Sequence, residues 1–243
     1  MKSDGNAIVF DGVTKSFRAY HHIGGIKHVL FNGLDAWRAV GRNRFTAIRD
    51  LSFSVKAGEG FGIYGRNGAG KSTTLALIAG VLSPCAGRVT VRGRVVPLLQ
   101  LGAGFHPDLT GRENILLNGM LLGMSRREVM AREDSIIDFA ELQAFIDEPI
   151  RTYSSGMLAR LGFAVAIHAD PEILLLDEIL AVGDTQFRAK CSERMEALRQ
   201  RGITMVVVSH QPQDIIKFCT RMIVIDDHRI VDQGAPEAVF SRI

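Results

Sequence analysis

Apolar residues along this chain fall into short β-rich runs separated by stretches with helical spacing. Residues 173–176 and 205–208 are apolar throughout, which predicts central strands buried on both faces of a sheet. Residues 7–13 and 47–55 alternate polar and apolar positions, as half-buried strands do, and Asp11-Gly12 predicts a turn. Strands that alternate with helices indicate an α/β core.

The remaining pattern divides the chain into a core and an insertion. Apolar residues recur at three- and four-residue steps from Leu109 to about residue 166, which indicates a helical subdomain inserted into the core. We therefore predict a single domain over residues 1–243, with its core at about 1–100 and 167–243 and the helical subdomain at about 101–166. The other predicted strands are 61–64, 90–99 and a hairpin of 222–225 with 229–231, and the other predicted helices are 72–79 and 187–201.

Residues 19–45 do not fit the minimal core. Their apolar side chains are spaced for one face of a helix, and basic residues surround that face. Two interpretations remain open for this amphipathic insertion: a surface helix that packs on its own domain, or an element at a membrane interface, where Trp and basic residues are favoured. The apolar positions are Ile26, Val29, Leu30, Leu34, Trp37 and Val40.

Composition narrows the class of protein. The chain has 243 residues, of which 47% are hydrophobic and 23% charged, and its net charge of +3 is too small to argue for a nucleic-acid partner. No window approaches the roughly 18–20 apolar residues needed to cross a bilayer, and the N-terminal apolar run is too short for a signal peptide. The three cysteines lack pairing or metal spacing, which favours reduced thiols in a cytosolic protein.

A glycine-rich loop predicts a nucleotide phosphate site. It follows the predicted strand 61–64, precedes the predicted helix 72–79 and satisfies G-x-x-x-x-G-K-[ST]. Glycines let successive backbone N–H groups converge on phosphate oxygens, Lys71 adds a cation between the β- and γ-phosphates of ATP, and Ser72 offers a hydroxyl to Mg²⁺. The predicted ATP-binding residues are Gly65, Arg66, Asn67, Gly68, Ala69, Gly70, Lys71, Ser72 and Thr73.

Polar residues end the two most apolar strands. Asp177 follows residues 173–176, on the side of the sheet where parallel strands bind ligands, so its carboxylate is expected to reach Mg²⁺ directly or through water. Glu178 comes next, and His210 follows the run 205–208 and a serine. By themselves Glu178 fits a surface acid at a strand end and His210 a structural histidine.

Taken in order, these strings resemble the ATP-binding-cassette (ABC) ATPases. The resemblance implies a P-loop NTPase α/β fold with a mixed sheet, an antiparallel β-subdomain and an inserted helical subdomain. It implies that Glu178 is the general base that polarises the attacking water, and that His210 contacts the γ-phosphate. The implied cofactors are ATP and Mg²⁺.

Tyr153-Ser154-Ser155-Gly156-Met157 stands where the family carries the signature L-S-G-G-Q. A serine hydroxyl, a glycine N–H and a helix N-terminus form a second anion site. Since this site is on the helical subdomain, we expect Ser154, Ser155 and Gly156 to contact the ATP of a facing copy, in a head-to-tail homodimer. An ordinary N-capped helix is the alternative, and Tyr153, Ser155 and Met157 depart from the family pattern.

The resemblance assigns three further residues. Asp184, in the string Ala-Val-Gly-Asp, resembles the D-loop at the dimer interface, and Gln100 resembles the Q-loop glutamine that binds Mg²⁺ and water. The family stacks adenine on an aromatic ring near the N-terminus, for which Phe17 is the candidate and Tyr20 the second choice. Either aromatic ring would also fit core packing.

Flanking strings are similar to a narrower group, the ATPase subunits that export O-antigen, capsular polysaccharide or teichoic acid; they cover residues 20–31, 98–119, 153–166 and 177–191. That resemblance implies a separate integral membrane subunit, a lipid-linked polysaccharide substrate and a peripheral position at the cytoplasmic face of the bacterial inner membrane. It also implies the form without a C-terminal carbohydrate-binding domain. Another transporter class or a non-transport ABC ATPase is the alternative.

Overall fold

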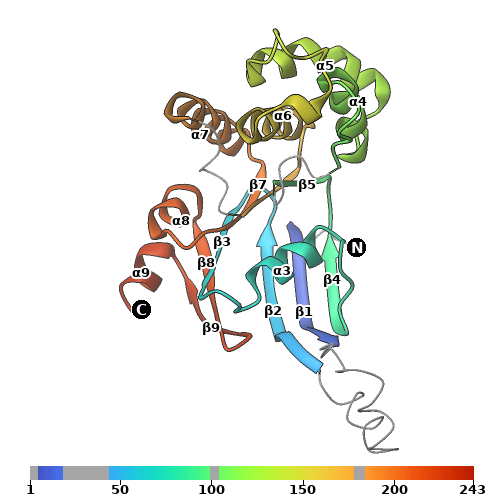
Figure 1. Ribbon diagram of the computed structural model, residues 1–243. Helices are drawn as coiled ribbons and strands as arrows, with labels where there is room; N and C mark the ends of the chain where they lie inside the picture. Colours follow the sequence, from blue (N-terminus) through green and yellow to red (C-terminus); the bar gives the residue numbers. More distant parts are fainter. Residues whose placement is uncertain (1–4, 19–43, 99–103, 178–183) are drawn as a thin grey trace, which may run out of the picture.

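The computed structural model describes residues 5–18, 44–98, 104–177 and 184–243. They form two β-sheets and a group of helices that gathers at one end of the molecule (Figure 1). Gln100, Glu178 and Tyr20, and the amphipathic insertion up to residue 43, lie outside the described residues. The predictions made for them therefore remain predictions.

The smaller sheet is the expected antiparallel β-subdomain. Its strands are β1 (Asn6–Arg18), β2 (Arg44–Lys56) and β4 (Ala86–Val91), in the order β2-β1-β4. The turn predicted at Asp11-Gly12 is wrong, because β1 continues through it. A register shift between Phe10 and Val13 absorbs these residues as a bulge, and Gly12 takes a φ of 58° there.

The larger sheet has six strands in the order β5-β6-β7-β3-β8-β9. Neighbouring strands run parallel except for the antiparallel hairpin of β8 and β9, so the predicted mixed sheet and final hairpin are confirmed. The strands are β3 (Gly60–Gly65), β5 (Val95–Leu98), β6 (Ile173–Asp177), β7 (Thr204–Val208), β8 (Arg221–Asp226) and β9 (Arg229–Gly234).

The single strand predicted at 90–99 is wrong, since β4 and β5 belong to different sheets. The chain turns at Gly93, whose φ of +115° is open to glycine and rare for other residues. The side chain of Glu172 lies where a Cβ on Gly93 would be, at 2.8 Å from its Oε2. Because the apolar pattern continues across this turn, periodicity alone does not reveal it.

Alternate residues of β6 and β7 enter two different cores. Leu174 and Met205 pack with the helical group, whereas Ile173 and Val206 pack with the small sheet and helix α3 (Lys71–Ile78). All four side chains have no exposed surface. This confirms that both apolar runs form central strands buried on two faces.

The segment predicted to be helical consists of α4 (Gly111–Leu121), α5 (Arg126–Ala140), the 3-10 turn η1 (Ile150–Thr152) and α6 (Ser155–His168). Capping boxes at Thr110 and Ser125 start α4 and α5. Helix α7 (Thr185–Gln200) lies beside α6, at the end of the molecule away from the small sheet (Figure 1). No helix in the described ranges is long and apolar enough to cross a membrane.

Two short helices were not predicted from the sequence. They are α8 (Pro212–Phe218) and α9 (Pro236–Phe240), and each begins at a proline. At the first helical position the missing N–H of proline costs nothing, because the helix makes no hydrogen bond with that group. The fixed φ of proline already suits a helix. Both stretches are too short for periodicity to reveal.

Candidate nucleotide site

The glycine-rich loop joins β3 to α3, as the motif requires. Lys71 is 7% exposed, and its Nζ donates hydrogen bonds to the carbonyl oxygens of Gly65 at 2.7 Å and Arg66 at 3.0 Å. Arg66, Asn67 and Gly68 are exposed at the tip of the loop. The ammonium group therefore stabilises the start of the loop by hydrogen bonds. It lies at the base of a turn that faces solvent.

Backbone geometry explains the glycines of this loop. A Cβ on Gly70 would lie 2.4 Å from the carbonyl oxygen of Ala47, and one on Gly65 would lie 2.2 Å from that of Ile225. Gly68 has a φ of 84° and nothing within 4 Å of its Cβ position. The first two glycines allow close packing and the third faces open space, which suits a loop that approaches phosphate through its backbone.

Strand order brings a predicted metal ligand, a predicted catalytic residue and the glycine-rich loop to one edge of the large sheet. Strands β6, β7 and β3 are adjacent and parallel, so Asp177, His210 and the glycine-rich loop all follow their carboxyl ends. Asp177 is directly paired with Val208, the last residue of β7. This edge is where open α/β sheets bind ligands.

Ser72 and Asp177 meet across this edge. Ser72 Oγ donates to Asp177 Oδ2 at 3.5 Å, although the two residues are far apart in sequence. A hydroxyl and a carboxylate oxygen are hard ligands of the kind that Mg²⁺ prefers. The structure thus brings together two of the three predicted metal ligands, while Gln100 lies in the part of the chain that is not described.

His210 is exposed just beyond β7, on a turn held by its neighbour. Ser209 is 2% exposed; its Oγ donates to Asp214 Oδ2 at 2.9 Å and accepts from the Gln211 N–H at 3.0 Å. This buried serine fixes the backbone on both sides of the histidine. The sequence predicted a role for His210 but did not reveal the supporting pair of Ser209 and Asp214.

The signature string begins α6. Ser154 is the N-cap residue, and its Oγ accepts from the Met157 N–H at 3.2 Å. Ser154 and Ser155 are exposed, and a Cβ on Gly156 would meet only Ser154 Oγ, at 3.8 Å. The helix N-terminus is therefore open to solvent and has unobstructed backbone around it, as an anion site requires.

Tyr153 anchors this N-terminus. Its ring is buried, and its hydroxyl donates to the Phe145 carbonyl at 2.6 Å. Burial raises the pKa of the phenol, with Asp147 and Glu148 adding to the effect, so it remains a donor at neutral pH. Tyr153, which stands where the family has leucine, is thus a buried residue with a hydrogen-bonded hydroxyl.

The signature and the glycine-rich loop belong to different parts of the molecule. Helix α6 packs on α4, α5 and β5, whereas α3 packs on β2, β3 and β4. Figure 1 shows α6 within the helical group and α3 against the small sheet. Each chain therefore presents two separate sites suited to phosphate.

Asp184 caps α7 by accepting from the Phe187 N–H at 2.9 Å, and it forms an ion pair with Arg160 of α6. The Phe187 N–H, together with the charge of Arg160, lowers the pKa of the Asp184 carboxyl, which is therefore ionised at neutral pH. Its contact with a second copy stays a prediction.

Phe17 lies near the end of β1 and is 37% exposed, with Lys15 Nζ 5.4 Å from the centre of its ring. It therefore does not pack in the core, and its exposed ring fits the proposed stacking on adenine. Its cross-strand partner is Phe45, which is 51% exposed. The Phe45 and His228 rings pack edge to face, with their centres 5.4 Å apart. Sequence reasoning missed Phe45, whose signal is an aromatic residue at an outward position of β2.

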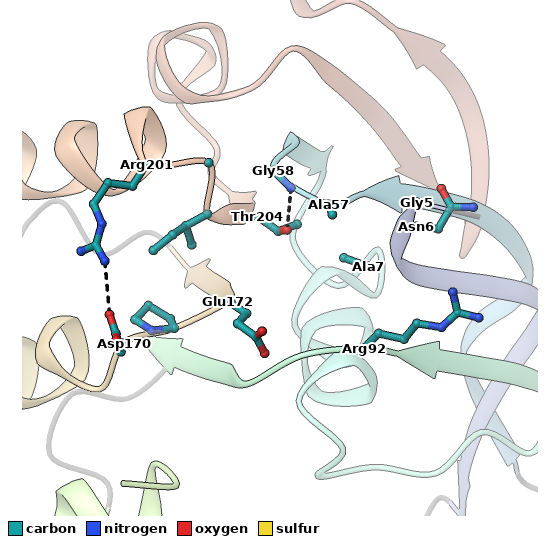
Figure 2. Close-up of a pocket in the computed structure, with 13 residues that line it drawn as sticks. Gly5, Asn6, Ala7, Ala57, Gly58, Arg92, Asp170, Glu172, Arg201 and Thr204 are labelled. Carbon is teal, nitrogen blue, oxygen red and sulfur yellow. Dashed lines mark hydrogen bonds and ion pairs between the residues drawn. The ribbon is translucent and has the colours of Figure 1, made fainter. Parts of the chain in front are cut away.

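A cavity of about 550 Å³ opens at the other end of the large sheet (Figure 2). It lies beside the amino ends of β6 and β7, and none of the predicted site residues lines it. Its polar groups are partly paired within the wall: Arg201 with Asp170 at 3.4 Å, and the Gly58 N–H with Thr204 Oγ1 at 3.0 Å. The nucleotide site is thus an open edge, distinct from this cavity.

Comparison with known proteins identifies the family. The ABC transporter family model matches residues 48–181. The chain is 52% identical to the O-antigen export system ATP-binding protein RfbB of Klebsiella pneumoniae, over 96% of this chain and 95% of that protein. It is 41% identical to the teichoic acids export ATP-binding protein TagH of Lactococcus lactis, over 80% of this chain and 42% of that protein.

Solved structures agree on the fold. A dimeric ATP-binding cassette in a post-hydrolysis state, bound to ADP and Pi, superposes with a TM-score of 0.73 at 23% identity, covering 94% of this chain and 98% of that one. The ATP-binding subunit of an ABC transporter gives a TM-score of 0.77 at 18% identity, covering 97% and 92%. This chain belongs to the ABC transporter family, as one of its ATP-hydrolysing subunits.

Proposed function

We propose that this ATPase drives the export of a lipid-linked polysaccharide, of the O-antigen kind, from the cytoplasmic face of a bacterial inner membrane. The observation that carries the proposal is the 52% identity to an O-antigen export ATPase over nearly the whole of both chains. Relatives named for teichoic acid export extend the resemblance to a second cell-surface polymer. A separate integral membrane subunit would supply the path for the polymer.

The phosphates of ATP would lie on the glycine-rich loop, at the N-terminus of α3, of which Lys71 is the first residue. The N–H groups there and the buried ammonium supply positive charge where phosphoryl transfer develops negative charge. The exposed ring of Phe17 would stack on adenine. This arrangement would position the γ-phosphate at the carboxyl edge of β3, β6 and β7.

Ser72 and Asp177 fit Mg²⁺, because both offer hard oxygen donors that lie 3.5 Å apart at the same edge of the sheet. The Ser72 hydroxyl would bind the ion, and the Asp177 carboxylate would reach it directly or through a water. Gln100 would complete the set. The ion would neutralise charge on the β- and γ-phosphate oxygens. Glu178 would accept a proton from the attacking water, and His210 would orient the γ-phosphate.

Two chains facing head-to-tail would complete each other's sites. Ser154, Ser155 and Gly156 present an open helix N-terminus that packs away from the glycine-rich loop of the same chain. A second copy would bring this N-terminus to the γ-phosphate, with Asp184 at the interface. The description of a matching cassette as a dimer with ADP and Pi supports this arrangement.

The membrane subunit would contact the helical subdomain close to the Q-loop. Gly104, the first described residue after that loop, packs against α4, and a Cβ there would lie 3.0 Å from Leu121 Cδ1. Leu121 is 65% exposed and its neighbour Met120 is 50% exposed. These neighbouring apolar side chains offer a partner an exposed surface on α4, beside Gly104.

Reconstitution tests the function. The chain and its membrane subunit, placed together in liposomes, should hydrolyse ATP faster when lipid-linked polysaccharide is added. Glu178→Gln should bind ATP but abolish turnover, since an amide cannot accept the water's proton. Glu193→Gln, an exposed substitution on α7, is the matched control and should retain activity.

The two parts of the proposal fail separately. An ATPase rate that is the same with and without the lipid-linked polysaccharide would contradict the export assignment. Unchanged turnover in Glu178→Gln would instead contradict the assignment of the base.

A further inference from the structure

The turn between β8 and β9 holds a histidine in a strained backbone conformation. Asp227 and His228 have φ values of 41° and 66°, in the left-handed region that Asn-Gly and Asp-Gly pairs usually occupy in two-residue hairpin loops. A histidine at the second position costs free energy that a glycine would not. A strained residue persists only where its surroundings hold it, and such residues are common at functional sites.

Contacts with β2 hold His228 in place. Its Nδ1 forms a hydrogen bond with the carbonyl oxygen of Ala47 at 3.1 Å, and its own carbonyl accepts from the Arg49 N–H at 2.8 Å. The plane of its ring is almost perpendicular to that of Phe45, at 89°. Three separate contacts with one strand therefore fix the imidazole against the ring of Phe45.

The turn lies at the edge of the large sheet that carries the proposed ATP site. Strand β8 runs parallel to β3, with Ile225 paired to Gly65 at the start of the glycine-rich loop. The carbonyl oxygen of Ala47, which bonds His228, lies 2.4 Å from where a Cβ on Gly70 would be. The two ends of the glycine-rich loop thus lie against the strand that leads into the turn and the strand that holds His228.

Phe45 stands opposite the proposed adenine contact. Phe45 on β2 and Phe17 on β1 are direct cross-strand partners, and such partners project from the same face of a sheet. Each ring has a different neighbour: the ring of Phe45 meets His228, and that of Phe17 meets Lys15 Nζ. Both rings are also partly exposed. Two neighbouring aromatic surfaces are therefore open to a flat ligand.

Stability of the small sheet does not account for an aromatic residue at this position. Phe10 and Phe53 show what a core ring does here, since they stack with their centres 4.5 Å apart and are 2% and 8% exposed. Phe45 buries far less apolar surface, and apolar burial is what stabilises a fold. A ring that a neighbour orients but leaves exposed suits a surface that a ligand covers.

We propose that Phe45, oriented by His228, is a second aromatic contact for the base of ATP. The adenine would lie against the rings of both Phe17 and Phe45, because every nucleobase offers a π-face that binds aromatic side chains. His228 is a positioning residue, since it acts through Phe45. The inference rests on the proposed ATP site and on the proposed stacking of adenine on Phe17.

Nucleotide affinity of the purified chain, measured by equilibrium dialysis, tests the proposal. Phe45→Ala should raise the Kd for ATP by about five- to tenfold, the lower part of the loss seen when a base-stacking ring is truncated. The Kd for inorganic tripolyphosphate, which has no base, should stay within about twofold. The kcat at saturating ATP should not change, because stacking binds ground state and transition state alike. Phe45→Trp should keep the affinity for ATP.

His228→Gly separates positioning from folding. Glycine suits this turn, so relief of the strained φ should offset the lost hydrogen bond and leave the denaturant midpoint nearly unchanged. The Kd for ATP should rise by about two- to fivefold, because Phe45 loses the ring that orients it. Met130→Ala removes a similarly exposed apolar side chain from α5 and is the control that should leave both Kd values unchanged.

Two results would overturn the proposal. One is a Kd for ATP in Phe45→Ala within twofold of that of the unaltered chain. The other is an equal loss of affinity for ATP and for tripolyphosphate, which would show damage to the glycine-rich loop. Unchanged ATP affinity in Phe17→Ala would instead contradict the base contact on which the inference rests, and so the two failures are distinguishable.

Discussion

Single side chains around the proposed ATP site are held in place by hydrogen bonds within the chain itself. Lys71 is buried and holds two carbonyl oxygens of its own loop. Ser209 is buried and fixes the turn that carries His210. Preorganised groups need no rearrangement when charge develops in the transition state.

Burial also predicts how the cysteines react. All three thiols are free, but only Cys85 is exposed. Burial raises the pKa of Cys191 to about 12 and also raises that of Cys219, so both stay protonated and unreactive at pH 8. A disulfide reagent should label one thiol quickly in the native protein and the other two only in denaturant. Cys85→Ser should remove the fast phase, and fast labelling that persists in this variant would contradict the burial.

At the scale of elements, α6 depends on its first residues. The Ser154 cap and the Tyr153 hydrogen bond to Phe145 fix where the helix starts. The predicted anion site exists only because this N-terminus is exposed. We therefore expect Ser154 to contribute both to the stability of α6 and to ATP hydrolysis.

Ser154→Ala should lower the free energy of unfolding by about 1 kcal/mol, as loss of an N-cap does, and should also reduce turnover. Ser125→Ala, at the cap of α5, is a matched control, because that serine likewise accepts from a backbone N–H in the same subdomain. It should cost similar stability in a denaturant titration and leave turnover intact. Equal ATPase rates in the two variants would contradict a direct role for Ser154.

The same elements show how far sequence reasoning reaches. Strands β6 and β7 were predictable because each is a compact apolar run that ends in a polar residue. The division of 90–99 into β4 and β5 was not, since it depends on which sheet receives each half. Asp11-Gly12 looked like a turn because a bulge uses the same residue types. Phe45 was missed because its ring partner His228 is distant in sequence. Ser209 was missed because the sequence does not show that this serine is buried, although its partners Gln211 and Asp214 are close by.

The whole molecule separates the two surfaces that are proposed to bind phosphate. The glycine-rich loop with Ser72, Asp177 and His210 lies at the carboxyl edge of the large sheet, while the signature begins α6 in the helical group (Figure 1). Sequence motifs predicted both surfaces, but only the fold shows that they lie at the N-termini of two different helices, α3 and α6. Pairing two chains would unite one surface from each.

ATP turnover per chain, measured across a dilution series whose oligomeric state is followed by sedimentation, tests this pairing most directly. The specific rate should fall toward zero as monomers come to predominate, and Ser154→Ala should lower the rate at every concentration. A specific rate that stays constant down to concentrations where sedimentation finds only monomers would contradict the shared site.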